Sequence, residues 1–273
     1  MTRRTARSRT VIARTVIART AIARTVILSG VPTLLLIRHG RTSANASGIL
    51  AGWLDGVGLD EAGVAQAARL SEDLGALPVC RVLASPLPRT LQTATPLAQR
   101  WGVPVEHDAG LGECRYGAWT GRPLSELAHE SLWQTVQRTP SAAHFPPSEA
   151  FESESLAQMS ARAVEAVRRT DAEVAAEHGP AAVWAAVSHG DVIKAIVADA
   201  LGLHLDQFQR IVIDPASVSV IRYPHGRPLV LRVNGPGVGL DALVPASEEA
   251  ASDEGAVGGG AGAPTGPGAD QGR

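Results

Sequence analysis

The sequence predicts an α/β fold, a three-layer sandwich with helices on both faces of a mainly parallel β-sheet. Two continuous apolar runs, residues 33–37 and 182–187, are typical of strands that are covered on both faces. Elsewhere apolar residues recur at helical spacing, which indicates helices with one buried face. Strands that alternate with helices in this way favour a parallel sheet.

The N-terminal half begins with the strand at 33–37 and continues into a glycine-rich loop at 48–58. Asp60 is expected to cap the helix that follows, with Leu59 and Val64 in contact as a hydrophobic staple. The stripe expected to face the core consists of Val64, Ala67, Leu70, Leu74 and Leu77.

A short strand at 81–84 leads into a second helix, which Ser85 should cap and Pro86 should open. Pro96 is expected to end or kink that helix, because proline has no N–H to donate. The remaining predicted elements are a strand at 103–105, a long helix at 156–174, a strand at 182–187, a helix at 192–201, and strands at 217–222 and 229–233.

Two terminal segments are expected to lie outside the folded domain, which spans 31–244. Residues 1–30 contain a repeated pentad, Thr-Val-Ile-Ala-Arg, whose period of five matches neither a helix nor a strand. We interpret this segment as a disordered Arg/Thr-rich leader. A true start near Val31 is one hypothesis, and a targeting peptide or a nucleic-acid-binding arm are the others. Residues 245–273, rich in Gly, Ala, Pro and acidic residues, should form a disordered tail.

The composition argues against several classes of partner. A formal net charge of −2 and 45% hydrophobic residues give no reason to expect a nucleic-acid or membrane partner. No run approaches the roughly 20 apolar residues of a membrane-spanning helix. Two cysteines, Cys80 and Cys114, are too few for a disulfide framework, which favours a reducing, cytoplasmic setting.

A histidine followed by glycine ends each of the two buried strands. His39-Gly40 follows the first strand and His189-Gly190 follows the later one. In parallel sheets ligands bind at the carboxyl ends of strands, and glycine lets the backbone come close to a ligand. One such histidine would more often be structural, but two of them with arginines nearby indicate a site.

The segment Leu36-Ile-Arg-His-Gly-Arg-Thr-Ser-Ala-Asn45 resembles the first signature of the histidine phosphatase superfamily, also called the phosphoglycerate mutase-like family. Further similar segments follow in the family's order, at residues 52–67, 85–94, 111–121 and 188–190. Trp119-Thr-Gly-Arg122 is more similar to the phosphatase branch than to phosphoglycerate mutases. Ser153-Glu-Ser155 departs from the family's Gly-Glu-Ser.

The resemblance implies a pocket in which Arg38, His39, Arg89 and His189 surround one phosphoryl group. His39 would be the nucleophile that forms a phosphohistidine, and the arginines would bind the phosphoryl oxygens. His189, protonated in the substrate complex, would stabilise the transition state. Glu113 would act as general acid and then as general base, a role that favours a pKa raised toward neutrality.

Three further residues near His39 are candidates for substrate binding. Thr42 and Asn45 are expected to donate hydrogen bonds to phosphate or to the loop. Arg41 is a weaker candidate, because exposed arginines are usually only solvated. Glu113 has acidic rivals in Glu106, Asp108 and Glu126, and only its sequence context selects it. The six other histidines are expected to be bystanders.

The resulting hypothesis is hydrolysis of a small phosphorylated metabolite. The alternatives are a phosphoglycerate mutase-like phosphomutase and a non-catalytic sensor of a phosphorylated ligand. No metal or other cofactor is expected, because the arginines neutralise phosphate charge and no cluster has the spacing of metal ligands. A small-molecule phosphate ester is the expected partner, with a homo-oligomer left open. Specificity should lie in the loop at 121–150, which gives no readable code.

Overall fold

A six-stranded mixed β-sheet forms the centre of the computed structural model, which describes residues 31–224, 227–240 and 244. The predicted leader at 1–30 and tail at 245–273 lie outside the described residues. The strands are β1 (Thr33–Arg38), β2 (Val79–Ala84), β3 (Val105–His107), β4 (Val183–Ser188), β5 (Val218–Arg222) and β6 (Leu229–Gly235).

The spatial order of the strands is β3-β2-β4-β1-β5-β6. The first four run parallel to one another, whereas β5 and β6 are antiparallel to their neighbours. The two strands that end in a His-Gly pair, β1 and β4, are direct neighbours, and Arg38 lies level with Ser188. The prediction of a mainly parallel sheet is therefore confirmed.

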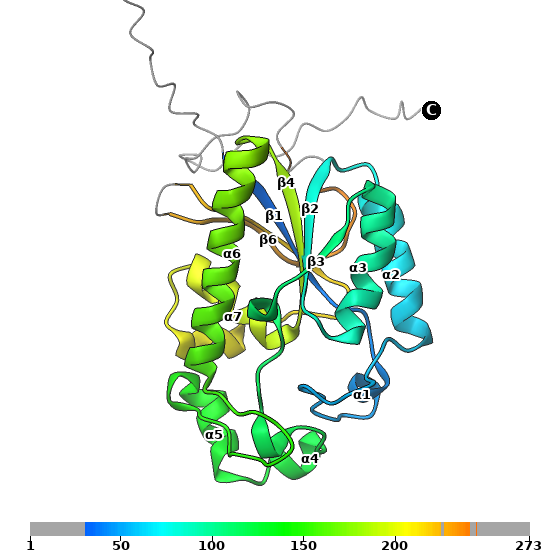
Figure 1. Ribbon diagram of the computed structural model, residues 1–273. Coiled ribbons are helices and arrows are strands. Elements are labelled where there is room, and N and C mark those ends of the chain that lie inside the picture. The colour runs from blue at the N-terminus through cyan, green and yellow to red at the C-terminus, as the bar shows by residue number, and fades with distance from the viewer. Residues whose placement is uncertain (1–30, 225–226, 241–243, 245–273) are drawn as a thin grey trace, which may run out of the picture.

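Helices cover both faces of the sheet, as predicted (Figure 1). The helices α2 (Glu61–Leu74) and α3 (Pro88–Trp101) cover one face, and α6 (Leu156–His178) and α7 (Gly190–Ala200) cover the other. The shorter helices α1 (Ser43–Ala46), α4 (Leu124–Leu127) and α5 (Ser131–Arg138) lie beyond the carboxyl ends of the parallel strands. Four 3₁₀ helices complete the described part, at Ala109–Leu111, Gly117–Trp119, Pro140–Ala142 and Leu205–Arg210.

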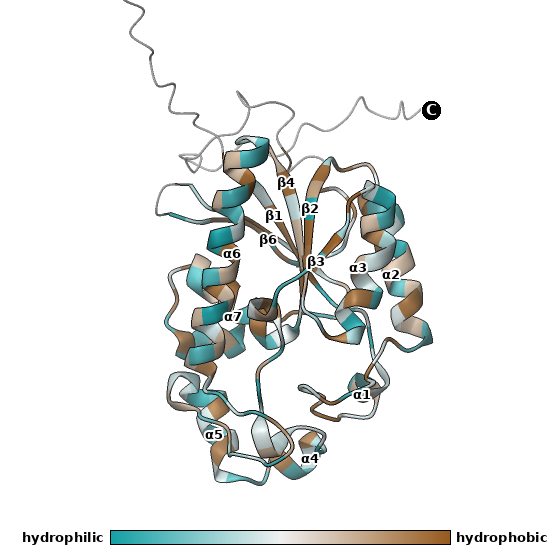
Figure 2. Ribbon diagram, viewed as in Figure 1, coloured by the Kyte–Doolittle hydropathy of each residue, from teal (hydrophilic) through white to brown (hydrophobic). Residues whose placement is uncertain are grey.

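Two hydrophobic clusters separate the layers. Alternate residues of β1 divide between them, so that Leu35 and Ile37 pack toward α2 and α3, and Leu34 and Leu36 pack toward α6 and α7. In Figure 2 the strands are largely brown while the helices show teal on their outer faces. None of the helices in the described part of the chain combines the length and hydropathy needed to cross a membrane.

The predicted core stripe of α2 is wrong at its first residue. Asp60 caps the helix as expected, with its side chain accepting from the Gly63 N–H. Val64, however, is 57% exposed, and the buried stripe begins at Gly63 instead. A Cβ atom at Gly63 would lie 2.0 Å from the Arg41 carbonyl oxygen, so this glycine allows α2 to dock directly on the segment that follows β1.

The predicted start of α3 is also wrong. The helix begins at Pro88 with Leu87 as its N-cap residue, and Ser85 lies before it. Prolines at both 86 and 88 allow the later start, because either can occupy a first turn, where no N–H is needed. Pro96 lies inside α3 without ending it, since the helix continues to Trp101.

Candidate active site

The ends of β1 and β4 bring the two His-Gly histidines together. The His39 amide donates to the Ser188 carbonyl at 3.0 Å, and the centroids of the His39 and His189 rings are 5.2 Å apart. Both side chains are buried. Because adjacent parallel strands end at the same edge of the sheet, their first loop residues meet there.

The tautomer of His39 follows from its backbone contact. Its Nδ1 atom lies 2.7 Å from the Gly40 carbonyl oxygen, which can only accept, so Nδ1 carries the proton. Burial, followed by the positive charge of Arg89, holds the pKa of His39 well below its ordinary value. The ring is therefore neutral at pH 7 and its Nε2 atom has a free electron pair.

Two guanidiniums lie close to His39. Arg89 is 2% exposed and donates from Nη2 to the Gly52 carbonyl at 2.9 Å. Arg38 donates from Nη1 to the Ile213 carbonyl at 2.6 Å. Both residues line a cavity of about 300 Å³ together with His39 and Glu113. Each arginine is thus fixed by a backbone carbonyl on one side while the rest of its guanidinium remains free to bind an anion.

His189 lies behind the lining of this cavity, and Ser85 fixes its orientation. Its Nε2 atom is 2.7 Å from the Ser85 hydroxyl, which the sequence had assigned to a helix cap. Burial and the charge of Arg89 hold the pKa of His189 well below its ordinary value. The imidazolium that the sequence predicts belongs to the substrate complex, where the charge of a bound phosphoryl group would have to outweigh the neighbouring guanidiniums.

Glu113 lies on the other side of His189, with its Oε2 atom 3.8 Å from the His189 Nδ1 atom. Its Oε1 atom accepts from the Cys114 amide at 3.0 Å. Burial, with the negative charge of Asp191 as the second cause, raises the pKa of Glu113 to about 7. The three other acids that were candidates for this role, Glu106, Asp108 and Glu126, do not line the cavity. Glu106 pairs with Arg81, and Asp108 pairs with Arg169.

Three buried side-chain nitrogen atoms of this cluster have no hydrogen-bond partner among the described residues. They are the Nε atom of Arg38, the Nη1 atom of Arg89 and the Nδ1 atom of His189. A buried donor without an acceptor costs about 1–3 kcal/mol. Phosphate, which has several acceptor oxygens, is an anion that buried guanidinium and imidazole groups of this kind bind.

The structure brings two of the three weaker candidates to the cavity. Thr42 and Asn45 both line it, and they form a capping box at α1 in which Asn45 Oδ1 accepts from the Thr42 amide and hydroxyl. Since the oxygen of Asn45 is engaged, its amide NH₂ remains as the available donor. Arg41 is not brought to the cavity, because its exposed guanidinium pairs with Asp60 at 2.8 Å. None of the described bystander histidines lines the cavity.

A polar cluster that sequence reasoning missed forms another part of the cavity wall. The Tyr116 hydroxyl donates to Asp191 at 2.8 Å, and the Lys194 ammonium contacts Asp191 at 3.3 Å and Gln209 at 3.1 Å. Asp191 and Lys194 lie three residues apart on α7, directly after His189. A helix that begins at a site histidine presents its first turn to the site, and this signal could have identified both.

Apolar side chains complete the cavity. Those of Trp133, Val136 and Phe145 come from α5 and the segment after it, within the loop region that was expected to govern specificity. Ser153 stands where the family has a glycine, and it packs against Gly117. A Cβ atom added at Gly117 would lie 2.8 Å from the Cβ atom of Ser153. No group of three or more potential metal ligands occurs among the described residues.

Comparison with known proteins identifies the family of the chain. The family model of the histidine phosphatase superfamily (branch 1) matches residues 34–236. The chain belongs to this superfamily, and the resemblance found in the sequence is confirmed.

The relatives include proteins that are named as phosphatases and proteins that are named as phosphoglycerate mutases. A glucosyl-3-phosphoglycerate phosphatase of Mycolicibacterium vanbaalenii is 30% identical over 183 residues, 65% of this chain and 78% of the relative. A 2,3-bisphosphoglycerate-dependent phosphoglycerate mutase of Streptomyces avermitilis is 37% identical over 118 residues, 39% of this chain and 46% of the relative. The structure of a mycobacterial glucosyl-3-phosphoglycerate phosphatase in complex with VO3 superposes with a TM-score of 0.65 at 25% identity, over 74% of this chain and 99% of that one.

Proposed function

We propose that the protein hydrolyses a small phosphate monoester through a phosphohistidine on His39. The observation that carries this proposal is the set of three unpartnered buried donors, on Arg38, Arg89 and His189, gathered around a neutral histidine. A phosphoryl group bound by these donors would present its phosphorus atom to Nε2 of His39, the nitrogen that carries the free electron pair.

In the first half-reaction, Nε2 of His39 attacks phosphorus and the bond from phosphorus to the ester oxygen breaks. Glu113 gives its proton to that oxygen, so the product leaves as a neutral alcohol. A carboxyl with a pKa of about 7 is suited to this step, because a substantial fraction is protonated at neutral pH. The two guanidiniums and His189 stabilise the charge on the phosphoryl oxygens.

In the second half-reaction, the Glu113 carboxylate takes a proton from water as the water oxygen attacks phosphorus. The bond from nitrogen to phosphorus breaks, its electron pair returns to His39, and inorganic phosphate is released. Glu113 is again protonated, and the cycle closes. One residue performs both proton transfers because the leaving alcohol and the entering water occupy the same side of phosphorus.

The substrate that fits best is a small ester. The cavity of about 300 Å³ offers a polar wall at Asp191 and Lys194 and an apolar wall at Trp133 and Phe145, so the alcohol would have both characters. The phosphatase relative is named for a small phosphorylated metabolite, which supports this class. Both cysteines of the chain are free, which is consistent with the cytoplasmic setting that we propose.

Phosphomutase activity is the second candidate, because a relative with 37% identity is named as a mutase and the same donors would serve transfer. A sensor is disfavoured, since recognition alone does not require a neutral histidine beside a buried, protonatable glutamate. Phosphate release from a panel of phosphorylated metabolites would separate the two enzyme classes. Net phosphate release supports hydrolysis, whereas isomerisation of a phosphoglycerate without release would contradict it.

The covalent step has its own test. Rapid quench of the enzyme and ³²P-labelled substrate in alkaline SDS should trap label that is base-stable and acid-labile, and His39→Ala should trap none. Label that persists in His39→Ala would show that another residue is the nucleophile.

A further inference from the structure

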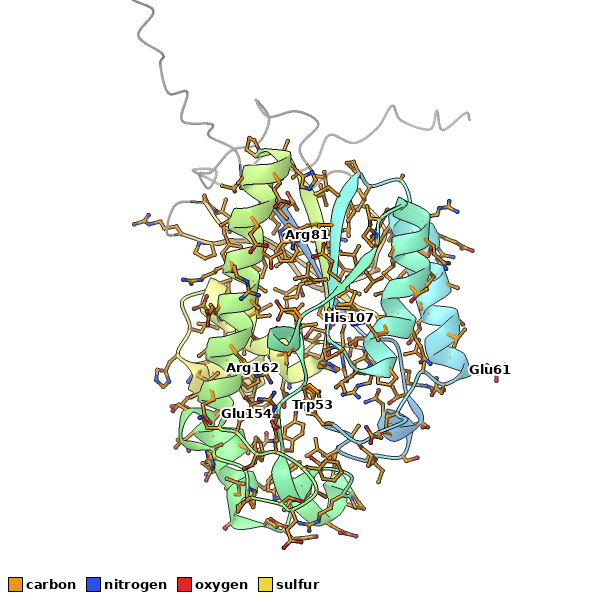
Figure 3. All side chains as sticks on the ribbon, viewed as in Figure 1. Trp53, Glu61, Arg81, His107, Glu154 and Arg162 are labelled. Atoms are coloured by element: carbon orange, nitrogen blue, oxygen red, sulfur yellow. The ribbon has the colours of Figure 1, made fainter. Side chains whose placement is uncertain are left out.

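The segment that bears Glu113 is held from two sides by side chains outside the phosphoryl-binding cluster. On one side, the Trp53 indole N–H donates to the carbonyl oxygen of Glu113 at 2.7 Å. On the other, the Arg162 guanidinium of α6 donates to that same carbonyl at 2.9 Å. Figure 3 shows Trp53, Arg162 and Glu154 close together near one end of α6.

Arg162 binds more of this segment than the single carbonyl. Its Nη1 atom lies within hydrogen-bonding distance of the carbonyl oxygens of Ala109, Gly110 and Gly112, at 3.3, 2.9 and 2.8 Å. Its Nε and Nη2 atoms pair with Glu154, at 3.0 and 2.6 Å. A rigid planar fork with five donors can contact several carbonyls at once, which a lysine ammonium does less well.

The segment also packs closely against both partners. A Cβ atom at Gly112 would lie 2.6 Å from the Trp53 ring, and one at Gly110 would lie 2.7 Å from the Cβ atom of Ala166 on α6. The two glycines therefore let the chain pass between the indole and the helix. Glu154 completes the arrangement, because it is buried and its Oε1 atom accepts from the Arg115 amide at 2.9 Å.

We propose that Trp53 and Arg162 are positioning residues that hold the carboxyl group of Glu113 over the leaving oxygen of the substrate. The inference rests on the proposed function. Neither side chain makes a hydrogen bond to Arg38, Arg89 or His189, so their effect should fall on proton transfer to the leaving group more than on phosphoryl binding. The Trp53→Phe variant removes the indole donor while keeping an aromatic ring against Gly112.

The test compares two esters that differ in their need for an acid. An alkyl phosphate such as glycerol phosphate requires protonation of its leaving oxygen, whereas p-nitrophenyl phosphate has a leaving group that departs as an anion. For Trp53→Phe we expect kcat/KM for the alkyl ester to fall about fivefold to tenfold, the size of one lost hydrogen bond. For p-nitrophenyl phosphate we expect a change below about twofold. When kcat/KM for the alkyl ester is measured against pH, its fall at alkaline pH should also occur at lower pH in Trp53→Phe than in the wild type. The reason is that a less enclosed Glu113 is easier to ionise.

Trp101→Phe is the matched control, since the Trp101 indole donates to the Leu74 carbonyl at 3.0 Å between α3 and α2, away from the cavity. It should leave both esters unchanged. Arg162→Lys is a second variant, which retains the positive charge opposite Glu154 and should show the same selective loss for the alkyl ester. It keeps the inference testable if Trp53→Phe folds poorly.

Equal losses for the two esters, or no loss for the alkyl ester, would overturn the inference while leaving the proposed function intact. If the wild-type protein releases phosphate from neither ester, the proposed function is wrong and the positioning inference falls with it.

Discussion

Glu113 and His39 must be in opposite protonation states for the first half-reaction. Glu113, with a pKa of about 7, has to hold its proton, and His39, whose pKa lies well below its ordinary value, has to be free of one. Activity toward an alkyl ester should therefore fall as pH rises through about 7. It should also fall at acidic pH, on a limb that lies below the ordinary pKa of histidine, about 6.5.

Measurement of kcat/KM against pH would check this, because that ratio reports the ionisations of the free enzyme. Glu113→Gln should abolish the alkaline limb and lower the rate for alkyl esters far more than for p-nitrophenyl phosphate. An alkaline limb that persists in Glu113→Gln would assign the acid to another group.

Ser85 gives a second prediction at the scale of a residue. Its hydroxyl lies 2.7 Å from the Nε2 atom of His189, and we expect it to donate to Nε2, which would place the ring proton on Nδ1, the atom without a hydrogen-bond partner. Ser85→Ala should lower kcat/KM about tenfold for every ester, since one hydrogen bond that orients a phosphoryl donor is lost. Steady-state kinetics would measure the effect, and losses confined to alkyl esters would contradict this role.

At the scale of elements, the contact between α2 and the end of β1 is set by backbone rather than by side chains. A Cβ atom at Gly40 would lie 2.7 Å from the Gly63 carbonyl oxygen, and one at Gly63 would meet the Arg41 carbonyl. The helix therefore supports the segment of His39 directly through two glycines.

Gly63→Ala tests this contact. In an ordinary helix the change would stabilise by about 1 kcal/mol, but here the steric conflict should dominate and lower the free energy of unfolding by about 1–3 kcal/mol. Urea denaturation would measure it, with the exposed Glu72→Ala of the same helix as a control expected within about 0.5 kcal/mol. A stabilised Gly63→Ala would show that the contact is loose.

The strands and long helices could be predicted because buried strands and amphipathic helices leave periodic apolar patterns. Polar contacts leave no periodic pattern in the sequence, and neither does a buried glycine. The errors fall at positions of these two kinds. Ser85 was assigned to a helix cap, a local role that its residue type favours, whereas its partner His189 is 104 residues away. Val64 was placed in the core because a glycine at the adjacent position carries no hydrophobic signal.

The site was predictable to the extent that strand ends identify it. His39 and His189 follow buried strands and could be placed at one edge of the sheet, and Arg38 and Arg89 come from segments similar to family signatures. Asp191 and Lys194 were missed, because an acid and a lysine on a helix are most often solvated. Arg41 was the weaker candidate, and its proximity to His39 in sequence did not reveal that it pairs with the carboxylate of Asp60.

At the scale of the whole molecule, arginines supply the positive charge that the proposed reaction needs. We therefore predict that phosphate release proceeds undiminished after dialysis against EDTA. The check is the rate before and after chelation with and without added divalent ions. Activity that is lost on chelation and restored by one ion would contradict the arginine-based mechanism.

The order of the strands in the sheet affects how the protein folds during its synthesis. Among the described strands β1 is synthesised first, yet both of its neighbours in the sheet, β4 and β5, are synthesised only after β2 and β3. At roughly 5–20 residues per second, its apolar side chains wait on the order of ten seconds for their partners. During that interval the nascent chain exposes an apolar segment that chaperones would bind, and a chain that ends before residue 189 lacks His189. The proposed site is therefore complete only after most of the domain has been synthesised.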